Sequence, residues 1–172
     1  MANYKDTFIE RTKNLFKKRP EIQKQFDQIR IIKPELCFSG KLVMEKGGRE
    51  FHFVYLGGHT PATSGLFLPQ ERILFTGDLV VVDEHPALGQ CISEEWLSKL
   101  RWLRRQKYEL LVPGHGPLCN VEASEPVSEY IRAMRSKVRS QYKSGRTKAE
   151  AAVVISQMID YFPYRQGEKS II

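Results

Sequence analysis

Residues 49–78 read REFHFVYLGGHTPATSGLFLPQERILFTGD, and this stretch decides the fold. An alternating run over 51–56 and an apolar run over 73–76 are both typical of β-strands. Each run leads through glycine to a side chain that can bind a metal ion, His59 after the first and Asp78 after the second. Glycine permits the tight turn and the close backbone approach that such a site needs.

A third junction of the same kind follows further along the chain. The strand-like residues 110–112 lead into Pro113, Gly114, His115 and Gly116. One Gly-His pair is weak evidence, but three strand-to-glycine junctions in one chain are harder to dismiss. They predict a metal or acid–base site built from His59, Asp78 and His115.

The residues around these junctions predict the remaining elements. Two hairpins are expected, residues 41–45 with 49–56 across Gly47-Gly48, and residues 65–68 with 73–76 across residues 69–72. A strand is expected over 109–112. Helices are expected over 4–18, 21–31, from Ser93 to about Lys107, over 127–142 and, from a Thr147-x-x-Glu150 capping box, to about Phe162. Ser93 is the expected cap of its helix, and Trp96, Leu100 and Leu103 are the expected buried stripe. Consecutive antiparallel strands covered by helices indicate an α+β or layered fold.

Composition sets the class of protein. At 172 residues, with 41% hydrophobic and 27% charged residues, the chain fits one domain with a real core. No apolar run could span a bilayer, the N-terminus lacks a signal-peptide core, and the three cysteines show no paired spacing. We therefore expect a cytoplasmic protein without a membrane partner. Of these cysteines, Cys119 is expected to fill a small buried apolar position.

The formal charge is +7, and residues 132–148 hold seven basic side chains and no acidic one. Such a run favours a solvated helix face, although it also keeps a nucleic-acid-binding function among the alternatives. A stacking platform for single strands is not evident, because only Tyr142 interrupts the run.

Three motifs, taken together and in order, resemble those of the metallo-β-lactamase-fold hydrolases. They are Leu56-Gly57-Gly58-His59-Thr60-Pro61, the stretch from Leu68 to Asp78, and Leu111-Val112-Pro113-Gly114-His115-Gly116-Pro117. The resemblance implies a layered αββα fold and a site for two metal ions, usually zinc and sometimes iron or manganese. It implies that His59 binds the first ion, that His115 binds the second, and that Asp78 bridges both and serves the catalytic step.

The resemblance further implies hydrolysis of an ester, lactone, thioester or amide bond in a small-molecule substrate. His85-Pro86-Ala87-Leu88-Gly89 is similar to a pocket loop of some branches, so His85 is the expected substrate-binding residue. His52 is expected to be structural, and Asp83 and Glu84 are expected to be solvated loop carboxylates.

The chain departs from the family at one point. The usual His-x-His-x-Asp-His motif is not found in residues 1–48, so three of the usual seven ligands are present. We expect a partial domain with a helical lead-in over 1–34, a metal-motif core over 41–117 and C-terminal helices over 122–165. Three ligands aimed at separate ions would hold one shared ion poorly, so weak metal binding is expected from this chain alone.

Half of a two-sheet sandwich would also expose an apolar face and an open edge. The face would be covered by a partner chain, by self-association or by the rest of a longer gene product. Three functions follow: a truncated or split metal-dependent hydrolase, a non-catalytic remnant acting as an interaction or oligomerisation module, and a nucleic-acid-binding or nuclease-related protein. The hydrolase is the first hypothesis and the nucleic-acid-binding protein the last.

Overall fold

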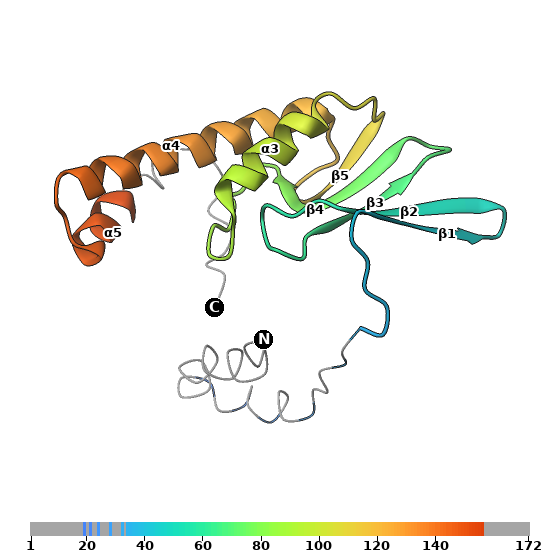
Figure 1. Cartoon of the computed structure of the whole chain (residues 1–172), viewed down its shortest axis with the longest axis horizontal. Helices are drawn as coiled ribbons and strands as arrows, with labels where there is room; N and C mark the ends of the chain where they lie inside the picture. The colour runs from blue at the N-terminus through green and yellow to red at the C-terminus, as the bar shows by residue number, and fades with distance from the viewer. Residues whose placement is uncertain are drawn as a thin grey trace. The chain divides into compact units, whose positions relative to one another are not determined.

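The computed structural model describes residues 34–156 and the single residues Arg19, Glu21, Lys24, Gln28 and Ile32. The chain divides into two compact units, one of residues 38–167 and one of residues 1–37 with 168–172. The fold below is that of the first unit (Figure 1). The predicted helix over 4–18, most of the one over 21–31 and the end of the last helix beyond residue 156 lie outside the described residues.

Both predicted hairpins form. Strand β1 (Lys41–Lys46) pairs antiparallel with β2 (Arg49–Tyr55), and β3 (Ser64–Leu68) pairs antiparallel with β4 (Ile73–Val81). The first turn uses Gly47 and Gly48 with φ of 60° and 72°. A two-residue turn with both φ values positive matches the right-handed twist of its strands, and glycine adopts it without strain.

A fifth strand, β5 (Leu110–His115), completes a single sheet in the order β1-β2-β3-β4-β5. It pairs with β4 in parallel, whereas all other pairs are antiparallel. The parallel direction follows from the connection, because helix α3 (Ser93–Leu103) carries the chain back along the sheet between these two strands.

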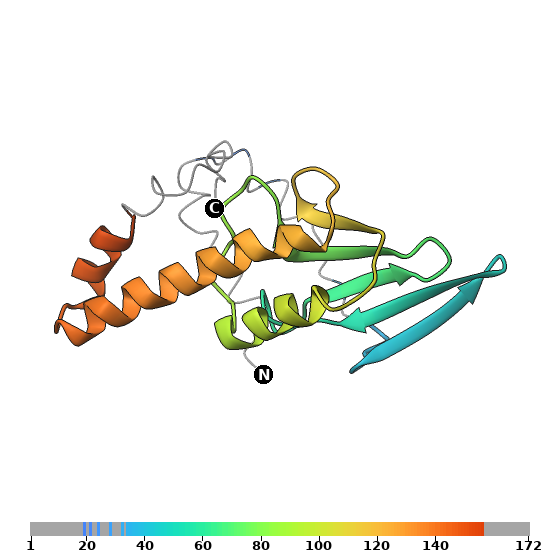
Figure 2. The ribbon, with the colours of Figure 1, turned by 90° about the horizontal axis from the view of Figure 1, so that it is seen from above.

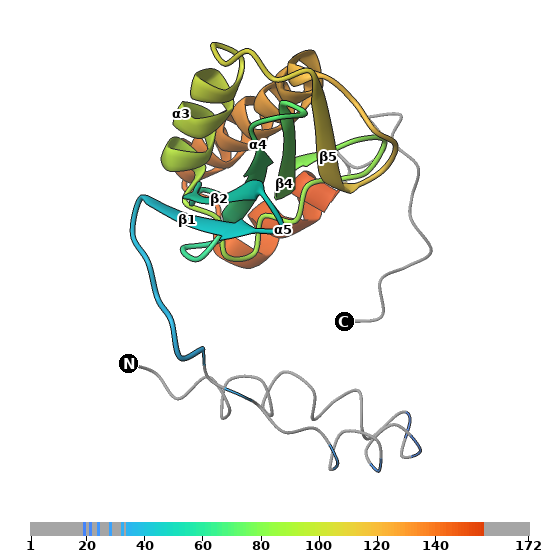
Figure 3. The same cartoon turned by 90° about the vertical axis from the view of Figure 1, so that its right-hand side faces the viewer.

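Helices cover one face of this sheet (Figures 1 and 3). After the short helix η1 (Val121–Ala123) comes α4 (Ser124–Lys143), and then α5 (Lys148–Ser156). The predicted stripe of α3 is confirmed, since Trp96, Leu100 and Leu103 are fully buried. They pack into one core with apolar residues of the sheet and of α4, among them Leu74, Leu79, Leu111, Val127 and Ile131.

The two helix starts differ in how well they were predicted. The capping box is confirmed, because the Thr147 amide donates to Glu150 Oε2 at 2.8 Å and the Glu150 amide donates to Thr147 Oγ1 at 3.3 Å. The predicted cap at Ser93 is wrong, since Ile92 takes the N-cap position without a side-chain hydrogen bond. The reason is tertiary: the Ile92 amide is tied to the Gly58 carbonyl at 2.8 Å, and the Ile92 carbonyl accepts the first helical bond from Trp96.

The other face of the sheet carries one apolar side chain from every strand. In register these are Leu42, Phe53, Leu66, Phe75 and Val112. Their immediate neighbours Leu74 and Leu111 are buried under the helices, and successive strand residues point to opposite faces. None of the five belongs to the described core, and Phe75 is 38% exposed. We call this row the second apolar face.

No helix among the described residues is both long and apolar enough to cross a membrane.

Leu100→Ala should lower the free energy of unfolding by about 2–5 kcal/mol, because it removes a fully buried side chain from α3. Leu118→Ala is the matched control, since that leucine is 62% exposed and its loss should cost no more than about 0.5 kcal/mol. Urea denaturation followed by circular dichroism measures both. Equal losses would contradict the described core.

Candidate metal centre

His59 lies on a loop that turns twice at glycine. Gly57 and Gly58, which connect β2 to His59, have φ of 65° and 79°. A Cβ on Gly58 would lie 2.6 Å from Trp96 Cα, so only glycine lets the loop lie against α3. The His59 ring meets the Trp96 indole edge-on at 5.1 Å between centroids, and its side chain is 15% exposed. The loop and α3 therefore hold the imidazole in place together.

Asp78 lies within β4 rather than on a turn after it. The sequence predicted a strand ending at Thr76, but β4 continues to Val81 because β5 keeps pairing alongside it. The pairing is irregular around Gly77, which has φ of 51°, and the register shifts on both sides of it. Such a bulge re-aims the following side chain, and here that side chain is Asp78.

His115 is the last residue of β5, and its neighbour Gly114 lies directly against Asp78. A Cβ on Gly114 would fall 2.0 Å from Asp78 Oδ1 and 2.7 Å from the Asp78 amide nitrogen. Absence of a side chain at Gly114 is thus what allows the third motif to reach the second.

The three predicted residues meet around the Asp78 carboxylate. His59 Nε2 lies 3.8 Å from Oδ2, and His115 Nε2 lies 3.7 Å from Oδ1. Each histidine therefore faces a different oxygen of the same carboxylate. The side chains of Asp78 and His115 are 37% and 53% exposed, so the arrangement opens to solvent.

Glu84 contacts the site, which the sequence does not predict. It was expected to be a solvated loop carboxylate, yet its Oε2 lies 3.2 Å from His115 Nδ1. An N–H on Nδ1 would donate to this oxygen and leave the Nε2 lone pair facing Asp78. The available signal is its position six residues after Asp78, which does not reveal that the loop brings it to His115.

The other singled-out residues make contacts of their own. His52 Nε2 contacts Glu50 at 2.6 Å, and the ring packs against Phe67, which fits the predicted structural role. The His85 ring packs edge-on against Tyr130 of α4 at 5.6 Å, and its substrate-binding role stays a prediction. Cys119 pairs with Leu111 through backbone hydrogen bonds, and burial raises the pKa of its thiol, which disfavours a thiolate ligand.

The donor set can be tested against a metal ion by its separations. Two atoms bound at about 2.0–2.2 Å to one tetrahedral ion lie roughly 3.3–3.5 Å apart. The two nitrogen–oxygen pairs, at 3.8 and 3.7 Å, are slightly wider than this. Across the described residues, no three His, Cys, Asp or Glu side chains converge on one point. The residues do not fit one three-ligand site. They fit two incomplete ligand sets, which we call half-shells, each made of one imidazole nitrogen and one oxygen of the shared Asp78 carboxylate. Each half-shell is short of the usual four ligands.

A family comparison decides what these junctions belong to. Residues 5–115 match the model of the metallo-beta-lactamase superfamily, well over half of the chain. The chain belongs to the metallo-beta-lactamase superfamily. This match confirms the resemblance carried by the three motifs. The superfamily is of hydrolase type and generally metal-dependent.

Solved structures of the superfamily share the fold. A metallo-beta-lactamase from Pontibacter korlensis matches with a TM-score of 0.52 and 25% identity, over 64% of this chain and 54% of that protein. A metallo-beta-lactamase family protein from Thermus thermophilus matches with a TM-score of 0.61 and 17% identity, over 78% of this chain and 49% of that protein. The chain thus spans about half the length of these members.

Gly114→Ala should lower the free energy of unfolding by roughly 1–3 kcal/mol and displace Asp78, because the added methyl group would overlap backbone and carboxylate atoms. Gly89→Ala is the matched control, since nothing lies within 4 Å of its added Cβ and its φ is not positive. Thermal unfolding measures stability, and imidazole NMR signals of His59 and His115 report the site. Equal behaviour of the two variants would contradict the close approach at Gly114.

Proposed function

We propose that this chain supplies one part of the metal site of a metal-dependent hydrolase acting on an ester, lactone, thioester or amide of a small molecule. The observation that carries the proposal is the Asp78 carboxylate, which presents Oδ2 to His59 and Oδ1 to His115. A carboxylate between two imidazoles suits a ligand shared by two cations. Zinc is the expected metal, and iron and manganese also accept this nitrogen and oxygen set.

The chain's own residues prepare the site for this role. In the proposed site Glu84 accepts the Nδ1–H of His115, which fixes the ring and leaves Nε2 free to bind a cation. Trp96 restrains the His59 ring through its edge contact. Metal ions, when bound, supply Lewis acidity that lowers the pKa of a water molecule and stabilises negative charge on the substrate.

Further ligands would come from protein beyond the described residues. Each half-shell holds one imidazole and one carboxylate oxygen, and structural or catalytic zinc takes at least three protein ligands. The second apolar face supports the same idea, because an apolar row across five strands is the surface on which another layer packs. We propose that a complementary protein segment, in a partner chain, a second copy or the same gene product, covers this face and completes the site.

Two alternative functions, an interaction module and a nucleic-acid-binding protein, can be compared with the hydrolase through contacts of particular residues. A non-catalytic interaction module would also use the second apolar face but would not need the alignment around Asp78. The basic run of α4 gives a nucleic-acid function little support, since Arg132 and Arg135 are engaged by Glu125 and Glu94 at 2.9 and 2.7 Å.

Zinc titrated into the nitrogen-labelled chain should shift the imidazole signals of both His59 and His115, with weak affinity, and leave His52 unchanged. Asp78→Asn should weaken the response of both rings by about tenfold or more, because it removes the charge that both half-shells share. Asp83→Asn is the matched control: it lies on the following loop with φ of 59°, which asparagine tolerates. NMR titration measures all three proteins.

A response of one ring alone to Asp78→Asn would contradict a shared carboxylate. If zinc shifts neither ring, the hydrolase proposal fails and the interaction module stands. Where both rings respond, ester, lactone and thioester panels should show metal-dependent turnover that Asp78→Asn removes and that rises when the complementary segment is added.

A further inference from the structure

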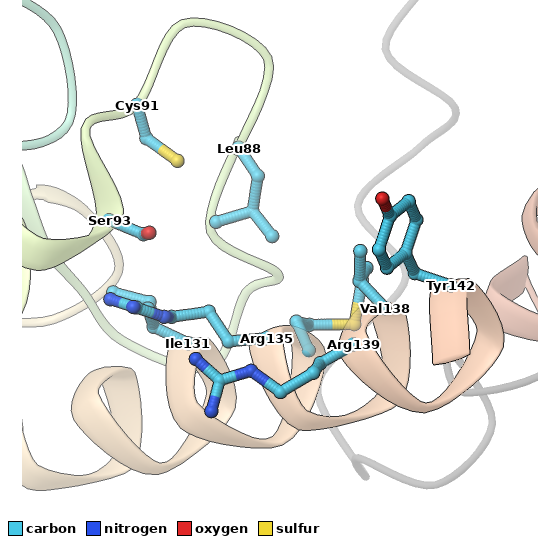
Figure 4. Close-up of a pocket in the computed structure, with 9 residues that line it drawn as sticks. Leu88, Cys91, Ser93, Ile131, Arg135, Val138, Arg139 and Tyr142 are labelled. Carbon is cyan, nitrogen blue, oxygen red and sulfur yellow. The ribbon is translucent and has the colours of Figure 1, made fainter. Parts of the chain in front are cut away.

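A cavity of about 450 Å³, open to solvent on one side, lies between α4 and the loop that joins β4 to α3 (Figure 4). Its walls are largely apolar and come from both sides: Leu88, Cys91, Ile131, Met134, Val138 and Tyr142. Pockets of roughly 300–1,000 Å³ with such walls hold small organic ligands in proteins. The cavity is thus large enough for a ligand, and none of its lining residues belongs to the candidate metal centre.

Charge is confined to one end of this cavity. Arg135 and Arg139 line it, and Figure 4 shows both extending toward the end where Ser93 lies, with Tyr142 at the opposite end. Arg135 is bound to Glu94 at 2.7 Å. Arg139 forms no ion pair with any residue that the structure describes. Arg135 and, to a smaller degree, the positive charge of Arg139 lower the pKa of the Glu94 carboxyl.

The balance at this end is therefore positive. Two guanidinium groups face one carboxylate, and the helix segment that carries them has no acidic residue from 132 to 148. Guanidinium is weakly hydrated and binds carboxylate in a bidentate manner, so Arg139 is well suited to receive an anionic head group.

We propose that this cavity binds a single-chain amphiphilic carboxylate, with the alkyl chain along the apolar walls and the carboxylate at Arg139. The apolar lining excludes a ligand that is charged along its whole length, because charged groups lose hydration there without a partner. The positive end disfavours an amphiphilic cation of the same length. This binding does not require the metal site and stands apart from the proposed hydrolase function.

The loop gives the cavity a physical connection to the candidate metal centre. Leu88 and Cys91 line the cavity, while Glu84 of the same loop contacts His115. Between them, His85 packs on Tyr130 of α4, and Pro86 is buried. Loop signals are therefore suitable reporters of ligand binding.

The test titrates decanoate, below its micelle concentration, into the full chain by calorimetry. Decanoate should bind one site and bind at least about tenfold more tightly than either decyltrimethylammonium or butyrate, since charge and chain both contribute. Amide signals of Cys91 and Arg139 should shift as the site fills. Absence of binding, or equal binding of the cationic amphiphile, would overturn the proposal.

An arginine variant on α4 tests the contribution of charge. Arg139→Gln should weaken decanoate binding about tenfold, the effect of losing one charge-assisted contact. Arg105→Gln is its matched control, because Arg105 is an exposed arginine just after the C-terminal end of α3 and does not line the cavity. A similar loss in both would mean nonspecific charge attraction and would overturn the assignment.

Val138 allows a sharper comparison, because it lines the cavity yet is 49% exposed, so a polar side chain there leaves the core intact. Both changes remove part of the apolar wall, but Val138→Glu should abolish decanoate binding by repulsion, while Val138→Lys, equally polar but of opposite charge, should weaken it much less. Circular dichroism confirms that both variants fold. An equal loss in both variants would contradict the role of charge at this cavity.

Discussion

The candidate metal centre depends above all on the packing of Trp96 against the ends of the first two motifs. Its side chain is fully buried, and its Nε1–H donates to the Leu79 carbonyl at 2.9 Å, one residue after Asp78. The same indole meets the His59 ring, and its Cα lies where a side chain on Gly58 would have to go. One residue of α3 thus fixes the positions of His59 and Asp78 together, because neither the His59 loop nor this part of β4 can move without breaking a contact with it.

Parallel pairing of β4 and β5 supplies the other constraint. It brings the ends of two strands that are separated by a whole helix to one edge of the sheet, which is where His115 meets Asp78. The bulge around Gly77 and the bare backbone of Gly114 then allow a carboxylate to lie between two imidazoles. The glycines beside His59 and His115 are therefore explained by close approach, and Gly77 by its positive φ of 51°, rather than by chain flexibility.

How far the sequence predicts this structure follows from the range of each interaction. Both hairpins, the buried stripe of α3 and the capping box at Thr147 are local patterns, and all were predicted correctly. His59, Asp78 and His115 stand out in the sequence because each follows a glycine directly, and their roles as metal ligands stay predictions. The predicted cap at Ser93 is wrong because a hydrogen bond from the Ile92 amide to the Gly58 carbonyl, 34 residues away in sequence, fixes the start of the helix. Glu84 and Trp96 were missed as site residues for the same reason, since only the folded chain brings them to the histidines.

The length of α4 accounts for the proposed ligand cavity. A 20-residue helix extends about 30 Å, and its buried apolar residues, Val127, Tyr130 and Ile131, lie in the first half. Figure 2 shows the helix continuing past the strands, so its second half has no sheet beneath it. The apolar side chains there, Met134 and Val138, face the loop before α3 across an open space. A core-forming helix that continues beyond its sheet leaves an apolar surface with basic residues on either side, and the loop before α3 links that surface to the residues around Asp78.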